Sequence, residues 1–116
     1  MAGRSFEDLE VWRRAMTLAT DVIERAERWR KPVLHDQLVR AVISVPSNIA
    51  EGAERLSALE FRQFLGYAKG SLGETRTQLL LAGRLGLEPQ EWIDSTVGEC
   101  RELGRMVWGL VKSLGD

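Results

Sequence analysis

Apolar residues recur three or four positions apart through four long segments of this 116-residue chain, and that period is typical of an amphipathic α-helix. We predict helices over about residues 6–29, 33–54, 58–84 and 89–114. No segment alternates apolar and polar residues as a half-buried strand does. Because the connections are only a few residues long, successive helices are expected to run antiparallel. The sequence therefore predicts one all-α domain over residues 1–116, an antiparallel up-down-up-down four-helix bundle.

Start and stop signals support these boundaries. Ser5 and Ser57 each stand three residues before a carboxylate, which is the layout of a capping box at a helix N-terminus. Pro32 follows a basic pair at the end of the first segment. Gly86 stands where a glycine commonly ends a helix, and Pro89 fits the first turn of the helix that follows.

The inventory of side chains excludes several kinds of site. A single cysteine, Cys100, rules out an internal disulfide framework and Cys-cluster metal sites, and a single histidine, His35, rules out multi-histidine sites. We therefore predict no cofactor and no metal. The 16 basic and 17 acidic residues leave a net charge of −1, which weakens the case for binding nucleic acid or an anionic membrane.

Nothing in the sequence predicts a membrane partner. The N-terminus becomes charged within its first eight residues, whereas a secretory signal carries an apolar core. No stretch approaches the roughly 18 consecutive apolar residues of a membrane span. We expect a cytoplasmic protein whose lone thiol stays reduced.

The apolar faces of the first, second and fourth segments are wider than one core requires. Each spans an arc of about 180–200° on a helical wheel, whereas a surface helix typically buries a stripe little wider than about 100°. Glu99 is the one charge inside the arc of the fourth segment. Exposed apolar surface of this size usually marks a partner surface, so we predict self-association. The alternative is a monomer whose alanines and valines stay half-exposed.

Glycines and tryptophans supply candidates for the contacts of an oligomer. Three glycines lie opposite the core stripe of the third segment, where each costs about 0.5–1 kcal/mol relative to alanine. They favour close approach of another backbone, from a packed helix or a neighbouring subunit, with a nucleic-acid phosphate as the alternative. The tryptophans favour packing, with stacking on nucleic-acid bases as the alternative. The predicted oligomer contacts are Trp12, Trp29, Gly66, Gly70, Gly73 and Trp108.

The second segment carries a polar stripe beside an internal proline. Four polar residues spaced +4, +3 and +4 share one helix face, and Pro46 removes a backbone hydrogen bond and predicts a kink. The stripe is either a hydrogen-bonded structural seam or a small polar binding site. The seam and its motif comprise Arg40, Ser44, Pro46, Ser47, Asn48, Glu51 and Gly52.

Neither catalysis nor a phosphate-binding track is predicted. No serine pairs convincingly with His35 as nucleophile with base, so the sequence predicts a protein that is not an enzyme. The densest basic spots, 13–14 and 28–31, have glutamates close by in the sequence, and solvated ion pairs are the expected reading. No clear cluster of basic residues is visible along the chain.

Three segments together resemble a known protein family. Residues 6–15 (FEDLEVWRRA), 41–52 (AVISVPSNIAEG) and 60–79 (EFRQFLGYAKGS, later ETRTQL) are similar to the bacterial four-helix-bundle proteins first noticed in intervening sequences of large-subunit ribosomal RNA genes. The resemblance covers about residues 5–112. It implies a bundle that assembles into a ring, typically a homopentamer, in agreement with the wide apolar arcs.

The resemblance extends to the accessory protein of diversity-generating retroelements. That relative binds a reverse transcriptase and nucleic acid through a strongly basic ring. The present chain departs from this pattern because its net charge is −1, and affinity for phosphate depends on clustered lysine and arginine.

Three functions compete on these grounds. The first is a non-enzymatic homo-oligomeric scaffold or adaptor, a pentamer by resemblance, that binds itself and a protein partner. The second is a nucleic-acid-binding accessory factor that works with RNA or a reverse transcriptase. The third is an enzyme acting on a small molecule, for which the sequence offers neither a cofactor nor a reactive constellation.

Overall fold

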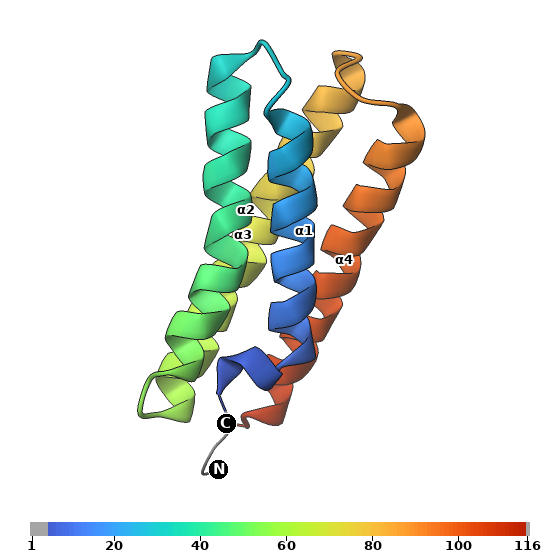
Figure 1. Cartoon of the computed structure of the whole chain (residues 1–116). Coiled ribbons are helices and arrows are strands. Elements are labelled where there is room, and N and C mark those ends of the chain that lie inside the picture. The colour runs from blue at the N-terminus through green and yellow to red at the C-terminus, as the bar shows by residue number, and fades with distance from the viewer. Residues whose placement is uncertain (1–4, 116) are drawn as a thin grey trace.

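The computed structural model describes residues 5–115, and its regular structure in that range is entirely helical (Figure 1). A short 3₁₀ turn, η1, precedes four α-helices. The elements are η1 (Phe6–Asp8), α1 (Glu10–Ala26), α2 (Pro32–Ala53), α3 (Ala58–Arg84) and α4 (Gln90–Ser113). The prediction of an all-α chain with four helices is confirmed for the described residues. Residues 1–4 and 116, which the predicted domain and the argument against a secretory signal include, lie outside them.

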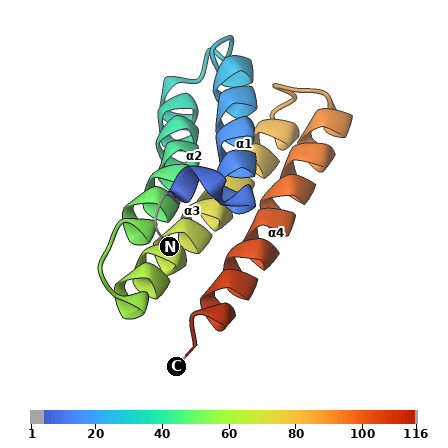
Figure 2. The same cartoon turned by 60° about the horizontal axis from the view of Figure 1, so that its bottom comes forward.

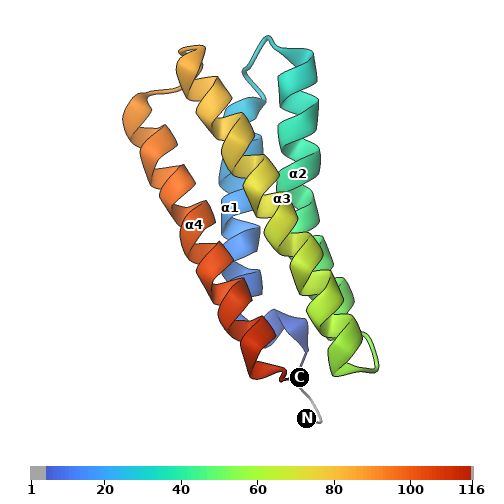
Figure 3. The ribbon, with the colours of Figure 1, turned by 180° about the vertical axis from the view of Figure 1, so that it is seen from behind.

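The helices lie side by side in a rod of 46 × 20 × 20 Å. Each helix contacts the next one along the chain, and α1 also contacts α4. The α2–α3 interface is the most extensive and the α1–α4 interface the sparsest. The beginning of α1 and the end of α4 lie at the same end of the rod (Figures 1 and 3). Figure 2 shows η1 lying across this end of α1 and α2, both of which it contacts.

The first helix is shorter than predicted at both ends. The capping box at Ser5 is present, but it closes only the turn η1. Leu9 then has an extended backbone, with φ −77° and ψ 125°, which separates η1 from α1 and turns Leu9 toward the core. At the other end α1 stops at Ala26, so Trp29 lies in the connection to α2. The prediction of one helix over 6–29 is therefore wrong, because a local cap and a tertiary contact of Trp29 override the apolar period.

Most of the wide apolar arcs is accounted for by the bundle itself. Since α1, α2 and α4 each pack between two neighbouring helices, each buries a broader face than a helix that lies on a single surface. Large side chains at the arc edges remain exposed, with Met16 at 42%, Ile43 at 46% and Trp108 at 51%. The surplus apolar surface of one chain is thus smaller than the helical wheels predict.

Packing of α2 against α3 requires a glycine at position 52. A Cβ built there would lie 2.8 Å from the Cβ of Phe64 and 2.9 Å from Cδ1 of Phe61, both on α3. A Cβ at Gly66, Gly70 or Gly73 would meet nothing within 4 Å. Close approach of another helix of the described chain to these three glycines, the first reading of their position, is therefore wrong.

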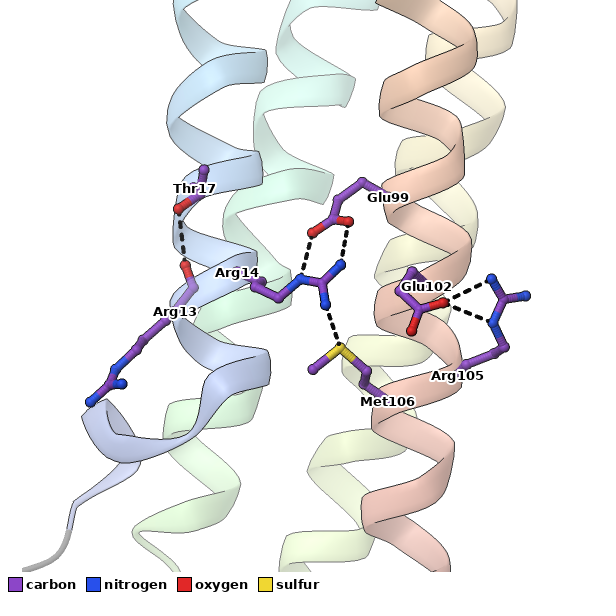
Figure 4. Close-up of polar contacts among 7 residues, drawn as sticks. All are labelled: Arg13, Arg14, Thr17, Glu99, Glu102, Arg105 and Met106. Carbon is purple, nitrogen blue, oxygen red and sulfur yellow. Dashed lines mark hydrogen bonds and ion pairs between the residues drawn. The ribbon is translucent and has the colours of Figure 1, made fainter.

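An ion pair bridges the sparse α1–α4 interface (Figure 4). Arg14 Nε and Nη2 donate to the two carboxylate oxygens of Glu99 at 3.0 and 2.6 Å, and Nη1 lies 3.4 Å from the sulfur of Met106. The hydrogen bond to Glu99 raises the pKa of Arg14 above its usual value. The one charge in the apolar arc of α4 thus has a partner on α1.

We expect Gly52→Ala to lower the free energy of unfolding by about 1–3 kcal/mol, because the added methyl group overpacks the α2–α3 contact. Gly98→Ala is the matched control on α4, where a Cβ meets nothing within 4 Å. It should raise the free energy of unfolding by about 0.5–1 kcal/mol through helix propensity. Urea denaturation at one fixed protein concentration measures both. A neutral Gly52→Ala would contradict the close contact.

We also expect a double-mutant cycle on Arg14→Ala and Glu99→Ala to give a coupling free energy of about 0.5–1 kcal/mol. The coupling free energy is small because solvent screens the pair, whose side chains are 37% and 32% exposed. The same urea titrations supply the four free energies. Additive single effects would show that the pair contributes nothing to stability.

Candidate functional site

The side chains of the polar stripe of α2 lie in two different kinds of surroundings. Ser44 lies at the α2–α3 interface, where its Oγ is 2.7 Å from Oγ of the buried Ser71 on α3. Asn48 Nδ2 donates to the carbonyl oxygen of Ser44 at 2.8 Å, and Ser44 Oγ donates to the carbonyl oxygen of Ala41 at 2.8 Å. This half of the stripe satisfies backbone and hydroxyl groups within the bundle.

The other half of the stripe is exposed. Arg40 and Ser47 are exposed, and Glu51 pairs with Arg55 one turn later at 2.9 Å. Pro46 is buried, and α2 continues through it as one helix over Pro32–Ala53. Of the two interpretations of the stripe, the structural seam agrees with the hydrogen bonds of Ser44, and the small polar binding site stays a prediction.

An apolar groove runs between α1 and α2, and we call it the α1–α2 groove. It brings together two of the segments that carry the family resemblance, around Trp12 and Pro46. Phe6 packs edge-on against Trp12 with ring centroids 5.1 Å apart. The groove is lined by Phe6, Trp12, Met16, Ala19, Thr20, Ile23, Ile43, Pro46, Ser47 and Ala50. Its exposed large apolar residues are Met16 on α1 and Ile43 on α2.

A second apolar groove lies between the start of α2 and the end of α3, and we call it the α2–α3 groove. Its exposed large residues include Val33 at 75%, Leu81 and Leu85. Oε1 of Gln78, on its wall, is buried without a hydrogen-bond partner. The groove is lined by Lys31, Pro32, Val33, Leu34, Gln37, Gln78, Leu81 and Leu85. It shares no residue with the α1–α2 groove.

A third groove, between α3 and α4, carries basic side chains, and we call it the α3–α4 groove. Figure 3 shows these two helices side by side. The groove is lined by Lys69, Leu72, Gly73, Arg76, Cys100, Arg101, Gly104, Arg105 and Trp108. It contains four cationic residues and no carboxylate. The sequence alone missed this cluster because its members are spread over 37 positions and two helices, and the only local signals are the spacings Lys69–Arg76 and Arg101–Arg105.

The predicted oligomer contacts fall into different surroundings. Trp12 lines the α1–α2 groove, while Gly73 and Trp108 line the α3–α4 groove. Gly66 and Gly70 lie exposed on α3. Trp29 has an intrachain role, because its indole N–H donates to Glu88 at 2.9 Å. The roles of all six as contacts between copies stay predictions.

Trp29 belongs to a polar cluster that ties two connections of the chain together. Glu88, whose side chain is only 6% exposed, also accepts from Arg25 Nη1 at 2.7 Å. The Arg25 guanidinium lies 5.0 Å from the ring centroid of Trp92, and the indole N–H of Trp92 donates to Asp21 at 3.1 Å. These contacts position the 85–89 connection against the end of α1.

Of the two candidate reactive side chains, His35 contacts a carboxylate and Cys100 is buried. His35 Nδ1 lies 2.9 Å from Oδ1 of Asp36 near the start of α2. Cys100 is buried on the floor of the α3–α4 groove, and burial raises the pKa of its thiol to about 12. Over residues 5–115, no three His, Cys, Asp or Glu side chains gather as a metal site would require. None of the described helices combines the length and apolar character of a membrane span.

A comparison with protein families gives one match that covers most of the chain. The model of the family described as "23S rRNA-intervening sequence protein" matches residues 7–109, from η1 almost to the end of α4. The match confirms the resemblance carried by the three segments around Trp12, Pro46 and Phe64. A search of curated proteins finds no match. The relation to the accessory protein of diversity-generating retroelements stays a prediction.

We expect the Cys100 thiol of the native protein to resist alkylation by iodoacetamide. A pKa raised from 9.0 to about 12 lowers the thiolate fraction at about pH 8 by roughly a thousandfold. The labelling rate, followed by mass spectrometry, should rise steeply in urea. Ser95→Cys in a Cys100→Ser background places the control thiol at an exposed position of the same helix. Equal native rates for the two thiols would contradict the buried, protonated state.

Proposed function

We propose that this chain, which belongs to the 23S rRNA-intervening sequence protein family, is a non-enzymatic scaffold that assembles into a homo-oligomeric ring. Each subunit would be an up-down-up-down bundle, and the copy number of five follows the family resemblance. The observation that carries the proposal is the pair of separate apolar grooves on the two flanks of α2. Burial of such surface in water is favourable and roughly proportional to its area.

Two different grooves suit a ring better than a two-fold dimer. A two-fold interface uses the same patch on both subunits, whereas a ring joins one patch to a different patch on the next copy. The α1–α2 groove offers Met16 and Ile43, and the α2–α3 groove offers Val33, Leu81 and Leu85. Because the grooves share no residue, one chain can contact two neighbours at once. The interface proposed joins the α1–α2 groove of one copy to the α2–α3 groove of the next.

A role without catalysis is supported by the state of the reactive groups. The Cys100 thiol is buried and protonated, and His35 is engaged by Asp36 rather than by a nucleophile. The hydroxyl of Ser44 is held by Ser71 and the Ala41 carbonyl, away from any base. The adaptor would act by presenting five copies of one surface to a protein partner.

Light scattering after size-exclusion chromatography tests the assembly. The wild-type mass should be near five times the 13.1 kDa of one chain. Met16→Glu and Leu81→Glu each place a charge in one groove, and each should release subunits, because an unpaired buried charge is strongly unfavourable. Leu56→Glu is the control, since that side chain is fully exposed outside both grooves. A monomeric wild type, or groove variants that keep the wild-type mass, would overturn the proposal.

Mixing the two groove variants tests the head-to-tail geometry. A Met16→Glu chain keeps its α2–α3 groove, and a Leu81→Glu chain keeps its α1–α2 groove. An equimolar mixture should therefore form pairs of about twice the chain mass, while each variant alone stays monomeric. Circular dichroism checks that both variants are folded. Failure of the folded variants to pair would exclude the proposed interface.

A further inference from the structure

The α3–α4 groove gathers positive charge in a chain whose net charge is −1. Lys69 and Arg76 project from α3, and Arg101 and Arg105 from α4. Like charges that converge on one hollow repel one another, and the field that they create attracts an anion. The groove is therefore the place on this chain where an anionic ligand has a physical reason to bind.

Three of the four cations are available to a ligand. Among the described residues, Lys69, Arg76 and Arg101 take part in no ion pair with a carboxylate. Arg105 is different, because its Nε and Nη2 lie 3.1 and 2.9 Å from Oε1 of Glu102 on the preceding turn (Figure 4). Two arginines and a lysine without carboxylate partners suit phosphate oxygens.

Glycines keep the walls of the groove low. Gly73 on α3 and Gly104 on α4 both line it, and a Cβ at either position would meet nothing within 4 Å. The hollow has a volume of about 410 Å³, which lies in the range of small-molecule sites, about 300–1,000 Å³. It has room for one phosphate-bearing unit with its ring, and its basic side chains lie within one connected surface.

Trp108 supplies an aromatic ring beside the cations. The side chain is half-exposed, and Lys112 Nζ lies 5.9 Å from its ring centroid on the same helix. An aromatic face next to basic side chains is the combination that binds nucleotide units, because the ring stacks on a base while the cations contact the phosphate. A simple carboxylate ligand would leave Trp108 unused, and an apolar peptide would leave the cations unused.

We propose that the α3–α4 groove binds a nucleotide unit, with its phosphate on Lys69, Arg76 and Arg101 and its base against Trp108. The unit is either a free nucleotide or one residue of a single strand, since both present the same phosphate and ring. The groove shares no residue with the α1–α2 and α2–α3 grooves. The proposal therefore goes beyond the scaffold function and does not depend on it.

Fluorescence anisotropy of a labelled single-stranded oligouridylate of about ten nucleotides tests the site, because single-strand sites commonly span about 4–16 nucleotides. The full wild-type chain should bind it, with log affinity falling against log salt at a slope of about −2 for three phosphate contacts. Arg76→Glu and Arg101→Glu should each weaken binding at least tenfold. Arg28→Glu, the control, makes the same charge change at an exposed arginine outside the groove.

Three further variants test the parts of this site and its independence from the ring. Glu102→Gln frees the Arg105 guanidinium, which lines the groove, from its carboxylate partner and should strengthen binding two- to threefold. Trp108→Ala should weaken binding of the oligouridylate, because the base loses its stacking partner. The affinity of inorganic phosphate, measured by competition, should stay unchanged. Met16→Glu should retain the wild-type affinity per chain, which distinguishes failure of this site from failure of the ring.

Competition assigns the source of the nucleotide unit. If uridine monophosphate displaces the probe as effectively, per nucleotide, as the unlabelled strand does, the groove binds a free nucleotide. If only the unlabelled strand displaces the probe, the groove binds single-stranded nucleic acid. Absence of binding at low salt would overturn the proposal. So would equal losses in Arg28→Glu and the groove variants, or an unchanged affinity in Trp108→Ala.

Discussion

The contact of α2 with α3 is held close by Gly52, where a methyl group would lie less than 3 Å from Phe61 and Phe64. This packing makes the α2–α3 interface the most extensive of the bundle. Further along the same interface, the hydroxyls of Ser44 and Ser71 lie 2.7 Å apart and form a part-buried hydrogen bond. A short side chain at each of these positions lets two long helices approach along their length, and the other two helices pack against that pair.

The opposite seam of the bundle has a different character. The α1–α4 interface is sparse, and polar groups bridge it at several levels of the rod. Arg14 contacts Glu99 and Asp21 contacts Trp92 across it, and at one end of the rod Glu88 of the 85–89 connection joins Arg25 of α1 and Trp29. Hydrogen bonds of this kind contribute modestly, about 0.5–1.5 kcal/mol each. They set the offset between the two helices where apolar contact is limited.

The grooves follow from this arrangement. Because α2 packs on α1 at one flank and on α3 at the other, it leaves an apolar hollow on each side, and these hollows share no residue. The α3–α4 groove instead collects Lys69, Arg76, Arg101 and Arg105 from two helices. A chain of nearly neutral charge thus separates apolar and basic surface onto different faces. Net charge describes the whole molecule, while a ligand meets only the side chains of one hollow.

Much of the fold could be read from the sequence. The apolar period, the N-cap at Ser57 and the stop at Gly86 predict the four helices, because these signals act between residues a few positions apart. The motif segments likewise predict the family. The first helix was predicted too long, since the extended backbone at Leu9 and the contact of Trp29 with Glu88 depend on parts of the chain that the local pattern does not contain.

The candidate sites required the tertiary structure. The sequence alone predicts a single polar stripe on α2, yet Ser44 belongs to the α2–α3 interface and Glu51 to an exposed ion pair. It shows no basic cluster, yet Arg76 and Arg101 line one groove. Backbone hydrogen bonds and side-chain period determine helices locally, so the sequence by itself determined the elements and the family. The rotation and offset of each helix against its neighbours depend on packing over the whole chain, so only the tertiary structure decided which side chains share a surface.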